Sequence, residues 1–191
     1  MTVPASTSRP AWVVEPERPA DTPAVERLVE EVFGDVMRTR ASWHLRQGVA
    51  HDPALAFVIR EAGGEIIGTV SITPVLVGGD RVMMLGPLAV RPDRKSKGMG
   101  TALMNRVMSA IRVLPAVRTG GLVFLVGDRD YYVRFGFERV PHRQITFAHP
   151  VDYDRVLAVE LVPGRLNEVG GLATKVRDDV LDHPQSGVLT E

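Results

Sequence analysis

Two glycines follow a short basic run in the stretch RPDRKSKGMGTALM, at positions 91–104. Gly98 and Gly100 permit a tight turn and let a ligand approach the main chain closely. The apolar spacing after them predicts a helix, whose first N–H groups are unpaired and carry positive partial charge. Arg94, Lys95 and Lys97 add positive charge immediately before the glycines. This combination predicts an anion-binding site, with a phosphate group as its ligand.

The known phosphate-loop patterns fit this stretch poorly. No segment supplies the P-loop pattern G-x-x-x-x-G-K-[ST]. The dinucleotide pattern G-x-G-x-x-G fails because Leu103 stands in place of the third glycine. On local pattern alone, a solvated basic loop before an ordinary helix explains the same residues, so both interpretations stay open.

Composition excludes several classes of function. The 191 residues carry 23 Lys and Arg against 23 Asp and Glu, so no general positive field attracts nucleic acid. No apolar run is long enough for a membrane span, and the N-terminus does not resemble a signal peptide. Cysteine is absent, which excludes disulfides, thiolate metal sites and a cysteine nucleophile. The five histidines lack metal-ligand spacing, so we expect no metal site. Taken together, these observations lead us to expect a cytoplasmic protein without a nucleic-acid partner or a membrane partner.

The elements that must position the glycine segment include both helices and strands. Strands are predicted at 12–16, 55–61, 65–77, 81–90, 121–126, 137–140, 144–149 and 156–162. Helices are predicted at 22–33, within 37–47, at 98–114 and at about 129–135. Pro87 cannot donate to a ladder, so the third strand of the expected antiparallel meander must have an edge, a bulge or a break there. We expect one mixed α/β (α+β) domain over 12–175, between flexible tails at 1–11 and 176–191.

Two segments together resemble the GNAT (Gcn5-related) N-acetyltransferases. LGPLAVRPDRKSKGMGTALM resembles that family's acetyl-CoA motif, V-x-P followed by [QR]-x-x-G-x-[GA] at a helix start, with Val90 and Pro92 in the first part. YYVRFGF, at 131–137, resembles the later Y-x-x-x-G-F segment. Together with LAVELVPGRL, at 157–166, they are most similar to the YhbS-type subgroup. Lys95 departs from the usual Gln or Arg, and Leu125 stands where many members carry Asn.

The resemblance implies the GNAT fold, with antiparallel N-terminal strands and a splayed parallel pair in a mixed central sheet flanked by helices. It implies acetyl-CoA as cosubstrate, with the pantetheine arm along one strand and the pyrophosphate on the glycine segment. The residues implied to bind the coenzyme through their backbone are Leu88, Ala89, Val90, Lys95, Ser96, Lys97, Gly98, Met99, Gly100 and Thr101.

The implied reaction is direct acetyl transfer to a primary amine of a small molecule or protein. Tyr132 is implied to be the catalytic acid, because it matches the motif tyrosine; a packing role is the alternative. Tyr131 is expected only to pack. The general base stays open among Glu65, His44, His51 and a water chain, and the acceptor pocket is expected within 33–55.

Two other functions stay in view. A non-catalytic acetyl-CoA-binding sensor needs the glycine segment but not Tyr132. A nucleic-acid-binding domain that uses RPDRKSK is disfavoured by the zero net charge. A homodimer is one option, because sheets of this type often pair subunits.

Overall fold

The computed structural model describes residues 11–94 and 98–176. The strands are β1 (Trp12–Pro16), β2 (Phe57–Glu61), β3 (Ile66–Val77), β4 (Asp80–Val90), β5 (Leu122–Val126), β6 (Glu138–Arg139), β7 (Ile145–Thr146), β8 (Val156–Glu160) and β9 (Gly171–Lys175). The helices are α1 (Thr22–Phe33), α2 (Ala41–Arg46), α3 (Met99–Arg112), α4 (Ala116–Thr119), α5 (Arg129–Tyr132) and α6 (Arg165–Glu168). The two expected tails fall almost wholly outside the described residues.

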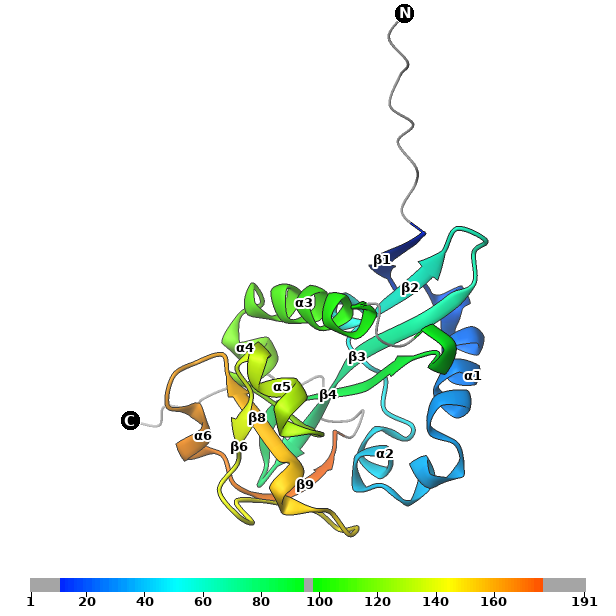
Figure 1. The fold of residues 1–191 in the computed structure, drawn as a ribbon. Coiled ribbons are helices and arrows are strands. Elements are labelled where there is room, and N and C mark those ends of the chain that lie inside the picture. The colour runs from blue at the N-terminus through cyan, green and yellow to red at the C-terminus, as the bar shows by residue number, and fades with distance from the viewer. Residues whose placement is uncertain (1–10, 95–97, 177–191) are drawn as a thin grey trace, which may run out of the picture.

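The sheet is mixed, as the sequence predicted. Its strand order is β1-β2-β3-β4-β5-β8-β6, with β9 paired to β3 and β7. The first four strands are successively antiparallel, and β4 and β5 are parallel. Figure 1 shows this curved sheet with α3 on one side and α1 and α2 on the other.

Helix α1 covers one end of the sheet because its apolar side chains recur at helical spacing. Leu28 and Val29 are buried, and Leu28 packs with Val58 and Ile66 of the first hairpin. The helix ends at Gly34, whose φ of 57° is accessible to glycine at little cost. The chain then turns toward α2, so the end of α1 lies close to the site described below.

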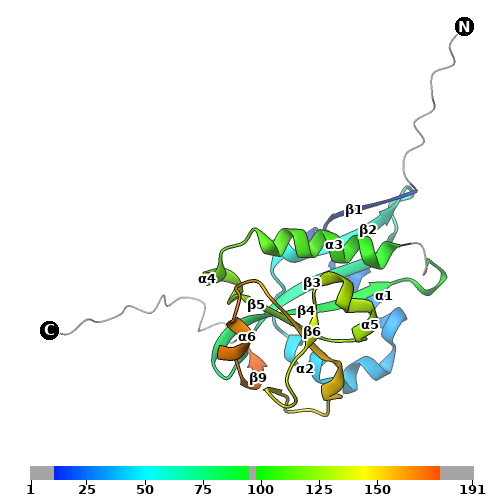
Figure 2. The same ribbon diagram turned by 60° about the vertical axis from the view of Figure 1, so that its left-hand side comes forward.

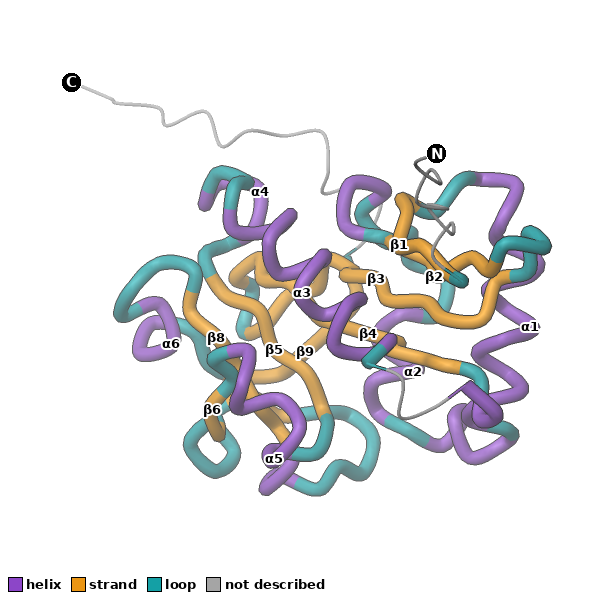
Figure 3. The backbone as a smooth tube through the Cα atoms, turned by 45° about the horizontal axis from the view of Figure 1, so that its top comes forward, coloured by secondary structure: helices purple, strands orange, loops and turns teal. Residues whose placement is uncertain are grey.

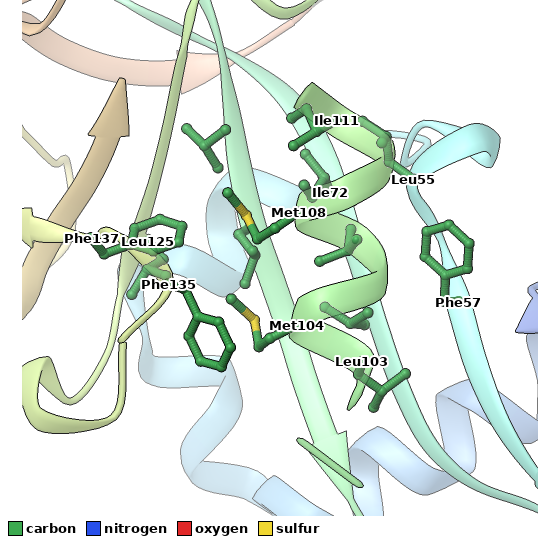
Figure 4. Close-up of a cluster of buried hydrophobic side chains, with 14 of the residues drawn as sticks. Leu55, Phe57, Ile72, Leu103, Met104, Met108, Ile111, Leu125, Phe135 and Phe137 are labelled. Atoms are coloured by element: carbon green, nitrogen blue, oxygen red, sulfur yellow. The ribbon is translucent and has the colours of Figure 1, made fainter. Parts of the chain in front are cut away.

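Helix α3 buries one face against the opposite side of the sheet. Leu103, Val107 and Ile111 follow one another at four-residue intervals and are fully buried. Figure 4 shows Leu103 and Ile111 beside Met104 and Met108, on the side of the helix that faces the strands. In Figure 3 the helix lies in front of the sheet, and Met99 in its first turn belongs to the same buried cluster as Met83 and Leu85 of β4.

Both faces of β4 and β5 are buried, which explains their nearly continuous apolar sequences. Met83 and Val123 face the α3 side, whereas their neighbours Met84 and Phe124 belong to the cluster on the other face. The side chains alternate because successive residues of a strand point to opposite faces. The two strands are therefore fixed from both sides at the point where they separate.

The structure adds elements that the sequence pattern did not predict. These are the single-turn helices α4 and α6 and the strand β9. Of the strand expected at 144–149, only Ile145–Thr146 forms β7. The two helices and β7 carry too few residues for a period to be recognised, and β9 has no apolar alternation because Ala173 is its one buried residue.

Candidate active site

Strands β4 and β5 separate after only two paired positions. Their register pairs Met83 with Val123 and Met84 with Phe124. Beyond that point β4 stays with β3 up to Val90, whereas β5 stays with β8. The opening lies at the cis Gly86–Pro87 bond, opposite a register shift in β3. The edge, bulge or break predicted at Pro87 takes the form of this register shift. No described strand other than β3 pairs with β4 over residues 85–90.

A cavity of about 300 Å³ occupies the opening. Its floor comes from β4 and β5, including Leu88 and Leu125. One wall comes from the end of α1 and from α2, including Phe33 and Arg46, and the other comes from α5. Elements distant in sequence thus converge here, and Figure 2 shows α5 on the same side of the sheet as the start of α3.

A second cavity, of about 290 Å³, lies at the start of α3. It is lined by Leu88, Val90, Arg94, Gly98, Met99, Gly100, Thr101 and Tyr131. Leu88 and Tyr131 line both cavities, so the two adjoin. Together they form a track along β4, from the first turn of α3 to the opening between the strands.

The first turn of α3 is shaped by its two glycines. Gly98 caps the helix in the left-handed conformation, with φ of 73°, and has open space where a side chain would stand. At Gly100 a Cβ would lie 2.8 Å from the hydroxyl oxygen of Tyr131. The helix start therefore needs glycine for backbone conformation at one position and for close contact at the other.

The charge of Arg94 is already compensated. Its guanidinium pairs with Glu61 at 2.8 Å and with Asp93 at 2.7 Å. Arg94 therefore adds less positive charge to the helix start than the sequence suggested. Lys95, Ser96 and Lys97 lie outside the described residues.

Tyr132 lies at the other end of the track, in the wall of the first cavity. Its ring packs edge-on against Tyr131, with centroids 4.9 Å apart, and against Phe137 at 5.9 Å. Burial raises the pKa of Tyr132 well above its ordinary value, and nearby Tyr131 adds to the shift; Arg155 and Arg46 oppose it. The phenol therefore holds its proton at neutral pH, as an acid must before it donates.

Tyr131 does more than fill the core. Burial raises its pKa as well, with the nearby Thr101 side chain and Arg134 opposing the shift, and its buried hydroxyl makes no hydrogen bond of normal geometry to a described residue. Because it lines both cavities and covers Gly100, it lies between the helix start and Tyr132. Later in the same motif, Gly136 has a φ of 92°, and the next residue, Phe137, is buried in the core.

The structure gives none of the candidate bases a place in either cavity. Glu65 pairs with Arg91, and His51 Nε2 lies 3.7 Å from Glu17 Oε1. His44 stacks on His149, with ring centroids 3.5 Å apart. Of the implied pantetheine residues, Leu88 and Val90 line the track, and Ala89 is buried between them.

Sequence reasoning missed three arginines in the first cavity: Arg40, Arg46 and Arg155. Two of them fall within the segment 33–55 expected to form the acceptor pocket. Burial and the nearby Arg40 lower the pKa of Arg46 to about 10, with Tyr132 opposing the shift. The only signal in the sequence was a pair of arginines six residues apart around a short helix.

Two further properties bear on function. Within 11–94 and 98–176, no group of three or more histidine, aspartate or glutamate side chains is arranged to hold a metal ion. No helix in these ranges is both long enough and apolar enough to cross a membrane.

Comparison with known proteins places these features in a family. The sequence profile described as "Acetyltransferase (GNAT) family" matches residues 22–137. The curated "Uncharacterized N-acetyltransferase YhbS" of Escherichia coli strain K12 is 28% identical over 160 residues, which cover 84% of this chain and 93% of the relative.

Solved structures agree with the sequence match. The crystal structure of the GNAT family N-acetyltransferase YhbS from Escherichia coli, in complex with CoA, superposes with a TM-score of 0.69. It is 25% identical, and the match covers 91% of this chain and 94% of that one. A GNAT family acetyltransferase from Brucella melitensis, in complex with acetyl-CoA, shares the fold: its TM-score is 0.53 at 24% identity, over 80% of this chain and 89% of that one. This chain therefore belongs to the GNAT acetyltransferase family.

Proposed function

We propose that the protein transfers the acetyl group of acetyl-CoA directly to a primary amine of a small molecule or protein. One observation carries the proposal: the track along β4 joins the glycine start of α3 to Tyr132. The CoA complex of the similar YhbS protein supports a coenzyme in this fold. The chain has no cysteine, which suits a reducing cytoplasm, where we place the reaction.

The coenzyme is held mainly by backbone groups in this proposal. The N–H groups from Lys95 to Thr101 bind the pyrophosphate at the positive end of α3. The pantetheine arm lies along Leu88, Ala89 and Val90, where β4 has lost β5 as its neighbour. This arrangement places the thioester near the opening at Gly86–Pro87.

The chemical step exchanges one bond for another. The neutral amine nitrogen attacks the thioester carbon, forming a C–N bond, and the C–S bond then breaks. A backbone N–H at the opening stabilises the negative charge that develops on the carbonyl oxygen. Tyr132 protonates the departing thiolate and recovers a proton from solvent, while the amine releases its proton to a water chain. The chain has no cysteine to carry an acetyl group, which favours direct transfer.

Calorimetric titration with acetyl-CoA and a CoA-release assay over a panel of amines test the proposal. We expect saturable binding and turnover, with kcat about 100- to 10,000-fold lower in Tyr132→Phe and acetyl-CoA affinity nearly unchanged. Tyr153→Phe is the matched control, because that tyrosine packs on His142 and Phe147, away from both cavities. Binding with no turnover on any amine favours the non-catalytic sensor, and absence of saturable binding excludes both functions.

A further inference from the structure

The first cavity has an unusual charge balance. Arg40, Arg46 and Arg155 reach it from the residue before α2, the end of α2 and the residue before β8. Asp128 is the sole carboxylate among the described residues that line it. One oxygen of Asp128 already accepts the Asp130 backbone N–H that caps α5. The cavity is therefore strongly cationic.

These three arginines also lack internal partners. No described carboxylate lies within ion-pair distance of their guanidinium groups, whereas other arginines, such as Arg60 and Arg165, each pair with two carboxylates. Arg40 lies over the ring of Phe33, 5.4 Å from its centroid. Arg46 is partly buried, and its Nη1 would be 2.7 Å from a Cβ placed on Gly86. Its charge is thus held at the opening between β4 and β5.

Of the three arginines, Arg46 is partly buried, whereas Arg40 and Arg155 are exposed. A partly buried cation without a counter-ion costs folding free energy, so this cost falls on Arg46. A bound anion offsets this cost, and the coenzyme's pyrophosphate is poorly placed to do so. The pyrophosphate site proposed above is at the start of α3, and none of the three arginines lines the cavity there. The arginines instead surround the end of the track that holds Tyr132.

We infer that the acceptor is a small amine that carries its own anionic group, a carboxylate or a phosphate. The anion binds Arg46, with Arg40 and Arg155 beside it, and the amine then points toward Tyr132 and the thioester. The cavity of about 300 Å³ also receives the thioester end of the coenzyme in this proposal, so the remaining space suits an acceptor no larger than an amino acid. This inference rests on the proposed acetyl transfer and narrows its acceptor class.

Matched acceptor pairs test the inference by activity. Each amino acid is compared with its amide and with the corresponding aminoalkylphosphonate, by CoA release at saturating acetyl-CoA. The amide has the more reactive amine at neutral pH, so a preference for the acid opposes intrinsic reactivity. We expect kcat/KM to be about tenfold to a hundredfold higher for the anionic acceptors. Preference for phosphonate over carboxylate identifies the anion as phosphate-like, and equal or better use of the amides overturns the inference.

Variants test whether the arginines cause the preference. Arg46→Gln is expected to remove most of the preference for anionic acceptors, because it raises the KM for these acceptors. The KM for acetyl-CoA is expected to stay unchanged. Arg38→Gln is the control, because Arg38 lies two residues from Arg40, is exposed and does not line the cavity. A rise in KM for acetyl-CoA in Arg46→Gln, with acceptor preference intact, assigns Arg46 to the coenzyme and overturns the inference.

Product binding separates this inference from the proposed function. With CoA present, N-acetyl amino acids and their amides are titrated by calorimetry, which requires no turnover. We expect the acid to bind at least about tenfold more tightly in the wild type but not in Arg46→Gln. This result supports the anion site even when no amine is acetylated, whereas equal or absent binding of the acid rejects it even when other amines are acetylated.

Discussion

The ring of Tyr132 lies directly against the backbone of Gly127, where a Cβ would be 2.3 Å from the ring carbon Cε2. Gly127 follows β5, so the end of that strand and the motif tyrosine fit together only if residue 127 has no side chain. Gly127→Ala is therefore expected to displace the tyrosine ring from its place in the cavity wall. We predict that kcat falls at least about tenfold while acetyl-CoA affinity changes little. Steady-state kinetics and calorimetry measure the two effects, and an unchanged kcat contradicts the assigned position of Tyr132.

The close contact between Gly100 and Tyr131 leads to a second prediction, which concerns acetyl-CoA binding. Gly100→Ala brings a methyl group within 2.8 Å of the Tyr131 hydroxyl oxygen, whereas the ring carbon Cζ would be at 3.7 Å, an ordinary contact. We expect acetyl-CoA to bind about tenfold more weakly to Gly100→Ala, and Tyr131→Phe to restore most of the loss by removing the hydroxyl. Tyr131→Phe alone is the control and is expected to fold normally, because its hydroxyl makes no described hydrogen bond of normal geometry and has the Thr101 side chain only as a neighbour. A double variant as weak as Gly100→Ala shows that the methyl group itself obstructs the coenzyme.

Backbone groups rather than basic side chains are proposed to hold the pyrophosphate. Gly98→Asp and Gly100→Asp are therefore expected to abolish acetyl-CoA binding, whereas Lys95→Ala only weakens it. Gly98→Asn separates charge from conformation, because asparagine tolerates the left-handed backbone, with φ of 73° here, better than most residues. We expect the asparagine variant to retain binding within about tenfold by calorimetry. The reverse order, with Lys95→Ala the more severe, contradicts a backbone cradle.

The charges of Arg46 and Arg60 are expected to have opposite effects on the free energy of unfolding. Burial lowers the pKa of Arg46 to about 10, so the folded protein binds this proton less tightly than the unfolded chain does. The charged Arg46 therefore lowers the free energy of unfolding. This loss of stability is fully present below pH 10 and disappears as the pH rises toward the ordinary pKa of arginine. Arg60 has its pKa raised by hydrogen bonds to Glu15 and Asp21, so its charge stabilises the fold at neutral pH.

Arg46→Met is therefore expected to raise the melting temperature at pH 7.5, and Arg60→Met to lower it. A change of about 1 kcal/mol in the free energy of unfolding corresponds to about 2–4 °C in a protein of this size. Differential scanning calorimetry checks both signs. A lower melting temperature in Arg46→Met means that the guanidinium stabilises the empty cavity, contrary to its described lack of a counter-ion.

Features set by local sequence were predictable, whereas those set by distant contacts were not. The four-residue spacing of Leu103, Val107 and Ile111 specified α3, and Pro87 marked the point where β4 changes its pairing. The family resemblance supplied the track along β4. Arg155 enters the cavity from more than 100 residues beyond Arg46, and no local period connects them. The contact of Tyr131 with Gly100 likewise depends on how α5 meets α3.

Strand β3 carries two successive neighbours on the edge that faces away from β4: β2 pairs with it from Ile66 to Val70, and β9 pairs with it from Val75 to Val77. The first pairing joins residues close in sequence, whereas the second joins Val75 to Lys175. Contacts between residues so far apart in sequence form slowly, because a long loop must close first. During synthesis the hairpins of β2 with β3 and of β3 with β4 can form early, while the outer edge of β3 from Val75 to Val77 must wait for the last described strand. The rate of folding is therefore expected to depend on the closure of β9, and an interrupted chain exposes a sheet edge open to association with other strands.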